Sequence, residues 1–287
     1  MRATRRAGRG WWRNFYSRAG YNRSARRISV SKTVSYTPGS FCWADLATKD
    51  LPAAKAFYAE MFGWNAVDVP TPGGPYVILQ SGGEDVAGLM PPPPGVPNYW
   101  GVHFAVASAD EAAAKIQAAG GKVLNGPFDA MDAGRLAVAQ DPQGACFGVW
   151  QAMKHTGASY QGAYGRIVWP ELVTRDVVGA AAFYKGLFGW GTKPETGLES
   201  AQYIEWQHGG QSSGGMLPMT GDKWTGIPPY WGLYITVADC DERTAKAVQL
   251  GSKVYVPPMD IPNVGRFSAI ADPQGAMFQI IHMTGVH

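Results

Sequence analysis

The hydrophobic and polar positions near the start of the repeat alternate residue by residue at first, and apolar residues then recur at every third or fourth position. Residues 41–47 alternate between two faces, and Trp43 and Asp45 share one of them, which is the pattern of a strand. Beyond Asp50, apolar residues recur at spacings of three and four up to Gly63, which is the pattern of a helix with one apolar stripe. Asp50 can cap this helix and Gly63 can end it. The pattern therefore predicts a strand followed by an amphipathic helix.

A second unit of the same kind follows. Residues 101–107 alternate like a strand, and Ser108 opens a helix with the spacing of a capping box. An Asp-Pro-Gln-Gly sequence at 141–144 is typical of a tight turn between strands. Four further strands are predicted, at 76–80, 85–90, 135–140 and 145–151. The pattern thus gives two units of strand, helix and strands.

These units occur twice along the chain. The block Phe-Tyr-x-x-x-Phe-Gly-Trp begins at Phe57 and returns 126 residues later at Phe183. The offset is still 126 at Met90, and it is 131 at the Asp-Pro-Gln-Gly turn, which recurs at 272–275. A period this long indicates two copies of a whole domain rather than a solenoid.

We expect the two domains at residues 38–151 and 163–283, a size that can bury a core without disulfides. The second copy is longer by five residues, and we expect all of them in one Pro/Gly-rich loop between Met216 and Tyr230. The three cysteines do not recur between the copies, so a disulfide framework is not expected and a reducing, cytoplasmic location is. No apolar run reaches the length of a membrane span.

Charge divides the chain unevenly. Residues 1–35 hold ten of the 25 basic residues and no acidic residue, whereas the rest carries a net charge of about −7. We expect a disordered basic arm. Aromatic residues lie among its arginines, and one interpretation is weak contact with nucleic acid or an anionic membrane. The other interpretation is a solvated tail or sequence upstream of the natural start.

The spacing of these motifs resembles a known family. Asp50, the Phe-Tyr and Phe-Gly-Trp pairs, and an Asp-Pro-Gln-Gly turn about eighty residues further on are similar to the glyoxalase, bleomycin-resistance protein and extradiol-dioxygenase superfamily, also called vicinal oxygen chelate proteins. The opening of each copy resembles that of the tandem glyoxalase-like proteins of actinobacteria. The resemblance implies an α+β fold: two tandem domains, with four βαβββ modules forming curled mixed sheets around cavities.

The same resemblance implies a metal site that these residues do not supply. Metal ligands of the superfamily stand on the first, fifth and eighth strands of a domain. Those positions correspond here to Trp43, Gly101 and Gly148 in one copy and to Trp169, Gly232 and Gln279 in the other. A metal site needs two or three convergent N or O donors. We therefore predict no metal ligands and no cofactor, with a divalent metal as the disfavoured alternative.

Other polar residues share strand faces with these positions. Asp45 lies two residues from Trp43, His103 two residues from Gly101, and Glu171 and Tyr234 stand at the matching positions of the second copy. A carboxylate beside an imidazole or a phenol suits proton transfer, so these four are candidate catalytic residues. The candidate ligand-binding residues are Trp43, Trp100, Arg135, Trp169, Trp231, Arg266 and Gln279. The alternative is that all of them fill or cap structure.

The sequence leaves three functions open. The first is a cavity protein that binds a small aromatic or heteroaromatic compound without metal, sequestering or transforming it. The second is an enzyme of the superfamily, related to lactoylglutathione lyases, isomerases, cyclases or dioxygenases, that uses Asp45 with His103 or Glu171 with Tyr234. The third is a non-catalytic interaction protein with a basic arm. Whether the chain is an enzyme, and whether it is a monomer or a homodimer, is left undecided.

Overall fold

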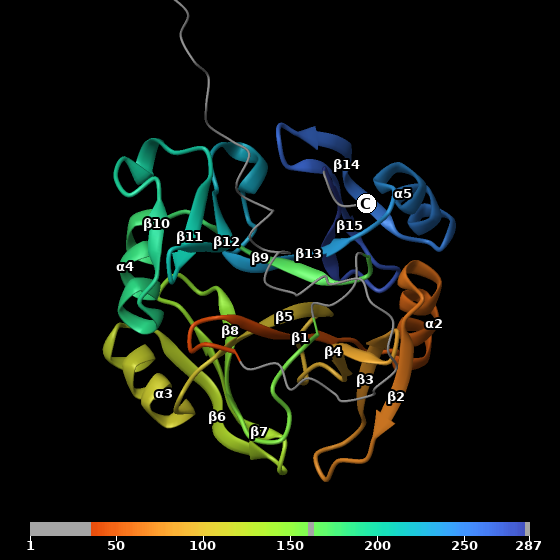
Figure 1. Cartoon of the computed structure of the whole chain (residues 1–287), viewed down its shortest axis with the longest axis horizontal. Helices are drawn as coiled ribbons and strands as arrows, with labels where there is room; N and C mark the ends of the chain where they lie inside the picture. Colours follow the sequence, from red (N-terminus) through yellow and green to blue (C-terminus); the bar gives the residue numbers. More distant parts are fainter. Residues whose placement is uncertain (1–35, 160–163, 285–287) are drawn as a thin grey trace, which may run out of the picture.

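A computed structural model describes residues 36–159 and 164–284, and the predicted basic arm lies outside these residues. Each half of the chain forms one eight-stranded mixed sheet with two α-helices (Figure 1). The strand order is β2-β3-β4-β1-β5-β8-β7-β6 in the first half and β10-β11-β12-β9-β13-β16-β15-β14 in the second, which is the same topology. The predicted α+β fold of two tandem domains built from βαβββ modules is confirmed.

The elements of the two halves follow one another in the same order. Those of the N-terminal half are β1 (Phe41–Ala47), α2 (Leu51–Phe62), β2 (Asn65–Val69), β3 (Tyr76–Ser81), β4 (Glu84–Met90), β5 (Tyr99–Ala105), α3 (Ala109–Ala118), β6 (Lys122–Ala130), β7 (Gly134–Gln140) and β8 (Cys146–Ala152). Those of the C-terminal half are β9 (Ile167–Thr174), α4 (Val177–Phe188), β10 (Gly191–Lys193), η1 (Leu198–Ser200), β11 (Ile204–His208), β12 (Gln211–Pro218), η2 (Asp222–Trp224), β13 (Tyr230–Thr236), α5 (Cys240–Gln249), β14 (Lys253–Ile261), β15 (Gly265–Ala271) and β16 (Met277–Met283).

The helices begin and end as the sequence predicts. The Asp50 side chain accepts a hydrogen bond of 3.0 Å from the backbone N–H of Ala53, and Gly63 ends α2 in the left-handed conformation with φ 68°. Asp176 and Gly189 do the same for α4. Of the helices in the described residues, none is both long and apolar enough to cross a membrane.

The offset between the halves changes at two places rather than one. Asp45 on β1 pairs with Gly88 on β4, and Glu171 on β9 pairs with Gly215 on β12, so β4 and β12 are related by 127 residues. One extra residue therefore precedes β11 and four lie in the loop between β12 and β13. The expectation of a single five-residue insertion after Met216 is wrong, because strand register fixes which residues are equivalent.

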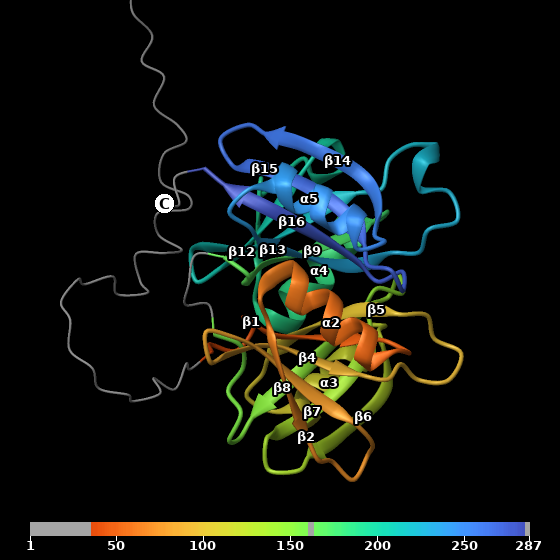
Figure 2. The same ribbon diagram turned by 90° about the vertical axis from the view of Figure 1, so that its right-hand side faces the viewer.

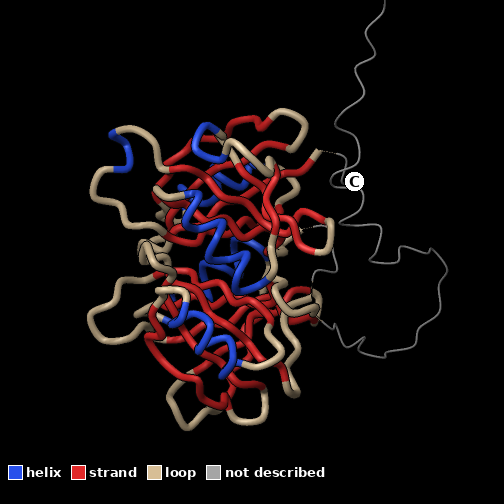
Figure 3. The backbone as a smooth tube through the Cα atoms, turned by 90° about the vertical axis from the view of Figure 1, so that its left-hand side faces the viewer, coloured by secondary structure: helices blue, strands red, loops and turns tan. Residues whose placement is uncertain are grey.

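The two halves pack through their helix-bearing faces. Figure 2 shows the C-terminal half above the N-terminal half with α2 and α4 between the sheets, and Figure 3 shows the helices gathered in the middle of the molecule. The ring of Phe104 lies 5.1 Å from that of Trp190 and 5.0 Å from that of Trp231, and Phe278 lies 6.5 Å from Phe57. One hydrophobic core therefore spans both halves.

Each Asp-Pro-Gln-Gly turn forms hydrogen bonds with the residues just before the first helix of the other half. The Gln274 side chain accepts from the Thr48 hydroxyl at 2.6 Å and the Asp50 N–H at 3.0 Å, and it donates to the Asp50 carbonyl at 2.9 Å. Gln143 makes the same three bonds to Thr174 and Asp176. These reciprocal bonds explain why the turn recurs in both copies.

We expect Gln274→Ala to destabilise the protein by about 1–2 kcal/mol, because it leaves the fully buried Thr48 hydroxyl without an acceptor. Gln143→Ala should cost a similar amount through Thr174. Urea denaturation followed by tryptophan fluorescence measures both. Gln117→Ala, an exposed position on α3, is the control. A stability equal to that of the control would show that the turns contribute nothing to the interface.

Candidate functional site

Strand alternation places polar side chains on the face of each sheet that carries no helix, which we call the helix-free face. On β1, Ala44 and Leu46 belong to the shared core, whereas Trp43 belongs to a separate small cluster with Trp150. On β9, Leu172 belongs to the shared core and Trp169 to a second small cluster. The helix-free faces therefore carry the strand side chains that do not pack into the shared core.

Asp45 is the centre of the N-terminal cluster, which consists of Trp43, Asp45, Tyr76 and His103. Its Oδ2 lies 2.9 Å from Nε2 of His103, and its Oδ1 accepts from the Tyr76 hydroxyl at 2.8 Å and the Trp43 indole N–H at 3.1 Å. Asp45 is 7% and His103 8% exposed. Burial raises the pKa of Asp45, but His103 and the donors outweigh it, so the pKa is lowered and the carboxylate stays ionised.

Glycines make room for this cluster. A Cβ atom at Gly148 would lie 2.0 Å from Nδ1 of His103, and one at Gly88 would lie 1.9 Å from Oδ1 of Asp45. Both positions therefore require glycine while these side chains keep their places. Gly148 stands where the resemblance implies a metal ligand, and the imidazole of His103 occupies the space that such a ligand would need.

The segment that leaves β8 covers the N-terminal cluster. The His155 ring packs edge-on against Trp43 with centroids 4.5 Å apart. The Ala158 N–H donates to the Cys42 carbonyl at 2.8 Å, and the Ser159 N–H donates to the Asp85 carbonyl at 2.7 Å. Residues 153–159 are thus fixed across the helix-free face beside the indole.

Glu171 is the centre of the C-terminal cluster, which consists of Trp169, Glu171, Tyr203, Tyr234 and Gln279. The Tyr203 hydroxyl donates to Oε2 of Glu171 at 2.8 Å and accepts from the Trp169 indole at 2.9 Å. The Tyr234 hydroxyl lies 3.2 Å from both carboxyl oxygens. All members except Tyr203, which is 38% exposed, are buried.

The protonation of the C-terminal cluster differs from that of the N-terminal cluster. Burial raises the pKa of Glu171 to about 7, and the hydrogen bonds from the two tyrosines only partly oppose this shift. In this cluster a phenol, Tyr234, takes the place beside the carboxyl group that His103 has beside Asp45. Burial, followed by the nearby Glu171 charge, also raises the pKa of Tyr230 to about 12. The half-buried Tyr230 is therefore a neutral phenol next to this cluster at ordinary pH.

The structure brings together Trp43, Asp45 and His103, and likewise the four predicted residues of the second copy. It places Trp100 and Trp231 elsewhere, in the core between the halves, where their indole N–H groups donate at 2.9 Å to Tyr58 and Tyr184 respectively. These hydroxyls bond in turn to the aspartates of the opposite turns. We therefore leave Trp100 and Trp231 out of the candidate site.

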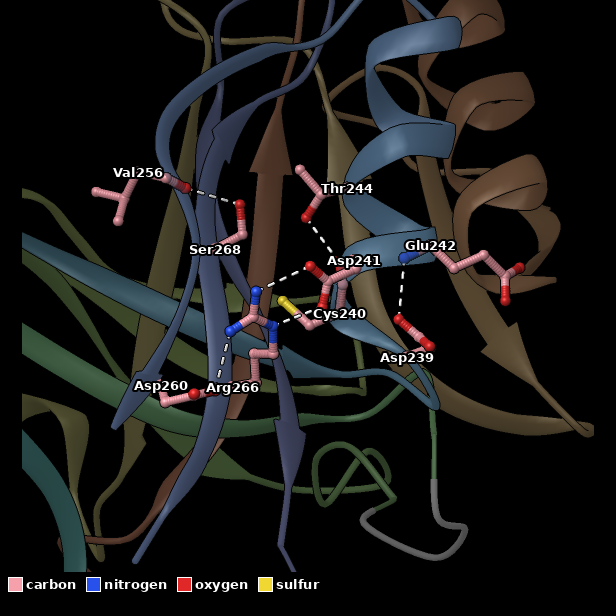
Figure 4. A network of polar contacts seen from close by, with 9 residues as sticks. All are labelled: Asp239, Cys240, Asp241, Glu242, Thr244, Val256, Asp260, Arg266 and Ser268. Carbon is pink, nitrogen blue, oxygen red and sulfur yellow. Dashed lines mark hydrogen bonds and ion pairs between the residues drawn. The ribbon is translucent and has the colours of Figure 1, made fainter. Parts of the chain in front are cut away.

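Arg135 and Arg266 are also separate from the clusters. Arg266 is held by Asp241 at 2.5 Å and 2.9 Å and by Asp260 at 3.0 Å, as Figure 4 shows. Arg135 is held in the same way by Asp110 and Asp129. Each guanidinium thus ties a strand pair to the first turn of a helix, and it does not face the helix-free clusters as an anion clamp.

The residues present do not fit a superfamily metal site. Across residues 36–159 and 164–284, no three His, Cys, Asp or Glu side chains are placed to hold a metal ion. Trp43 directs an indole N–H at Asp45, and Nε2 of His103 is engaged by the same carboxylate. In the other half the carboxyl group of Glu171 accepts from two tyrosines. The nitrogen and oxygen atoms that could coordinate a metal ion are therefore already engaged in hydrogen bonds within the clusters.

Tyr76 and Tyr203 complete the clusters and were not among the predicted site residues. Each donates to the carboxylate and accepts from the indole of its own half. They are equivalent residues 127 positions apart. A repeat aligned at an offset of 126 does not match them, because one extra residue precedes β11. The signal available in the sequence was a tyrosine at the first residue of β3 and a tyrosine immediately before β11.

The fold and these clusters define a tandem protein of paired βαβββ modules with a carboxylate on each helix-free face. The family model of the Glyoxalase/Bleomycin resistance protein/Dioxygenase superfamily matches residues 40–148 and 166–280. The chain belongs to this superfamily, as its motifs predicted. Figure 1 shows both matched segments as the two sheets with their helices.

Two relatives extend over most of the chain. A Mycobacterium tuberculosis protein named "Putative glyoxylase CFP32" is 38% identical over 260 residues, which is 88% of this chain and 98% of that protein. The anthracycline biosynthesis protein DnrV of Streptomyces peucetius is 35% identical over 266 residues, 86% of this chain and 94% of that protein. Both are therefore similar to this chain over both halves.

Solved structures of lower identity share the fold. The Mn(II)-bound glyoxalase from Novosphingobium aromaticivorans has a TM-score of 0.56 at 19% identity, covering 85% of this chain and 82% of its own. A variant of homoprotocatechuate 2,3-dioxygenase from B. fuscum has a TM-score of 0.60 at 16% identity, covering 90% and 76%. At these identities the likeness concerns the fold alone.

Proposed function

We propose that this protein binds a small, flat aromatic or heteroaromatic compound on the helix-free face without a metal ion, and sequesters or transforms it. The observation that carries the proposal is a buried carboxyl group set among indole and phenol groups in each half. Aromatic walls suit a flat ligand, and a few convergent polar atoms fix its orientation. Tyr203, which is 38% exposed, offers a contact at the surface of the C-terminal cluster.

The relatives support a compound of this kind. DnrV, similar along nearly its whole length, has a name that assigns it to the biosynthesis of anthracyclines, which are polycyclic aromatic compounds. The donor sets support independence from metal, because the positions of the superfamily ligands hold Trp43, Gly101 and Gly148 in one half.

A second candidate function is proton transfer on the bound compound. Glu171, with its pKa raised to about 7, can hold or release a proton near neutral pH, and Tyr234 contacts both of its oxygens. A carboxyl group poised in this way suits a metal-independent isomerase or cyclase. Asp45 and His103 form the corresponding pair of the other half.

The proposal is tested on the full chain dialysed against EDTA, with metal content measured by mass spectrometry. We expect naphthalene-sized probes such as 2-naphthol to bind the metal-free protein in isothermal titration calorimetry, with unchanged affinity after Mn²⁺ or Zn²⁺ is added. A stoichiometric metal that survives dialysis, or binding that needs added metal, would contradict metal independence. Absence of binding by every aromatic probe would contradict the function itself.

A further inference from the structure

We infer that the two clusters are not equivalent: the C-terminal cluster is the ligand site and recognises an uncharged phenolic hydroxyl through Gln279 and Glu171, whereas the N-terminal cluster is structural. This inference rests on the proposed function and names the ligand class and the half that binds it.

Within the described residues the N-terminal cluster leaves one buried polar atom, Nδ1 of His103, without a partner, and the cluster is covered. Both carboxylate oxygens of Asp45 are engaged, by His103 on one side and by Tyr76 and Trp43 on the other. The remaining ring nitrogen, Nδ1 of His103, lies against the backbone of Gly148, where even a Cβ atom would come within 2.0 Å. His155 packs on the outer side of Trp43. The unpaired Nδ1 therefore faces backbone rather than open space, and His155 covers one side of the indole.

The C-terminal cluster contains a buried acceptor that nothing in the described residues satisfies. Oε1 of Gln279 has no hydrogen-bond partner there, although Gln279 is only 6% exposed. A buried amide oxygen without a donor has lost its hydrogen bonds to water without replacement, and a ligand donor would restore one. Among the residues of this cluster, Gln279 is thus the side chain that a ligand would complete.

The amide of Gln279 lies over Gly232, the residue that faces Glu171 on the neighbouring strand. A Cβ atom at Gly232 would lie 3.3 Å from both Oε1 and Nε2 of Gln279, so the amide sits over this glycine. Gly232 pairs with Glu171 across β13 and β9, and Tyr234, which bonds Glu171, pairs with Gln279. Glycine at 232 therefore leaves room for the Gln279 amide on the strand next to Glu171.

The chemistry of these two groups selects a neutral hydroxyl on an aromatic ring. A phenol can donate to Oε1 of Gln279 and accept from the protonated Glu171 with the same oxygen. A carboxylate or phosphate ligand would meet Glu171, and no member of the C-terminal cluster is basic. Trp169 and the partly exposed ring of Tyr203 favour an aromatic rather than an aliphatic alcohol.

The test compares 2-naphthol with 2-methoxynaphthalene, which has the same rings but cannot donate. Calorimetry at pH 6.5 uses the full chain, Gln279→Met and, as a matched control on the exposed side of α5, Gln249→Met. We expect one 2-naphthol per chain and about tenfold tighter binding of 2-naphthol than of the ether. Gln279→Met should bind both compounds about equally, and Gln249→Met should keep the preference.

The outcomes separate this inference from the function on which it rests. Equal binding of both compounds by the wild-type chain overturns the phenol inference but leaves aromatic binding intact, and this comparison does not depend on any variant folding. Two sites per chain, or an undiminished preference in Gln279→Met, overturns the assignment to the C-terminal half. No binding of either compound overturns the proposed function, and the inference falls with it.

Discussion

Asp45→Ala should destabilise the protein by about 3–5 kcal/mol, because each buried donor left without an acceptor costs about 1–3 kcal/mol. Three donors lose their acceptor at once: Nε2 of His103, the Tyr76 hydroxyl and the Trp43 indole N–H. The site is closely packed, since a Cβ atom at Gly88 would lie 1.9 Å from Oδ1 of Asp45. Urea denaturation at pH 7, followed by circular dichroism, measures the change.

Two further variants give this prediction its controls. Asp45→Asn keeps one oxygen acceptor and should lose less stability than Asp45→Ala. Asp68→Ala removes an exposed carboxylate that pairs with Lys55 on the surface, and its stability should stay close to that of the wild type. If Asp45→Ala were no less stable than Asp68→Ala, the N-terminal cluster would not have the structural role that we assign to it.

Much of the fold was predictable because it depends on local signals. Capping at Asp50 and the left-handed Gly63 fix the ends of α2, and alternation fixes the faces of β1. The edge strands β2 and β6 were not predicted. Their residues are mostly exposed, so they carry no alternation of apolar and polar positions, and they become strands only by pairing with β3 and β7.

The candidate site was predictable in part for a related reason. Face sharing along β1 and β5 correctly grouped Trp43, Asp45 and His103. It did not find Tyr76, because that residue comes from a strand beyond β4 whose register depends on the whole sheet. Trp100 was misleading, since it lies one residue from Gly101 and therefore points into the shared core.

The motifs that identify the superfamily form the interface between the halves. The residues of the two clusters, in contrast, differ from one half to the other. Tyr58, Asp272 and Gln274 all bond across the interface. In the clusters, His103 pairs with Gly148, and the equivalent Tyr234 pairs with Gln279. The imidazole needs the space above a glycine, whereas Tyr234 bonds Glu171 and leaves room for a longer neighbour. The two halves thus share a frame and differ in chemistry.

This difference should be measurable in the pH dependence of stability. The folded-state pKa of Glu171 is raised from 4.5 to about 7, so between these values the folded chain holds a proton that the unfolded chain has released. Stability from this residue is therefore fully present below pH 4.5 and is lost as the pH rises to about 7, by about 3 kcal/mol in total. Asp45, whose pKa is lowered, acts in the opposite sense and below its ordinary value of 3.8.

Glu171→Gln isolates this contribution, because the amide keeps the shape of the side chain and cannot ionise. The variant should be close to the wild type in stability at pH 5 and more stable than it by about 2–3 kcal/mol at pH 8. Urea denaturation at half-unit pH intervals gives the difference curve, and Glu199→Gln, an exposed carboxylate on η1, is the control that should follow the wild type. A constant difference between Glu171→Gln and the wild type from pH 5 to 8 would mean that Glu171 is ionised throughout. The protonated carboxyl group on which phenol recognition relies would then be absent at neutral pH.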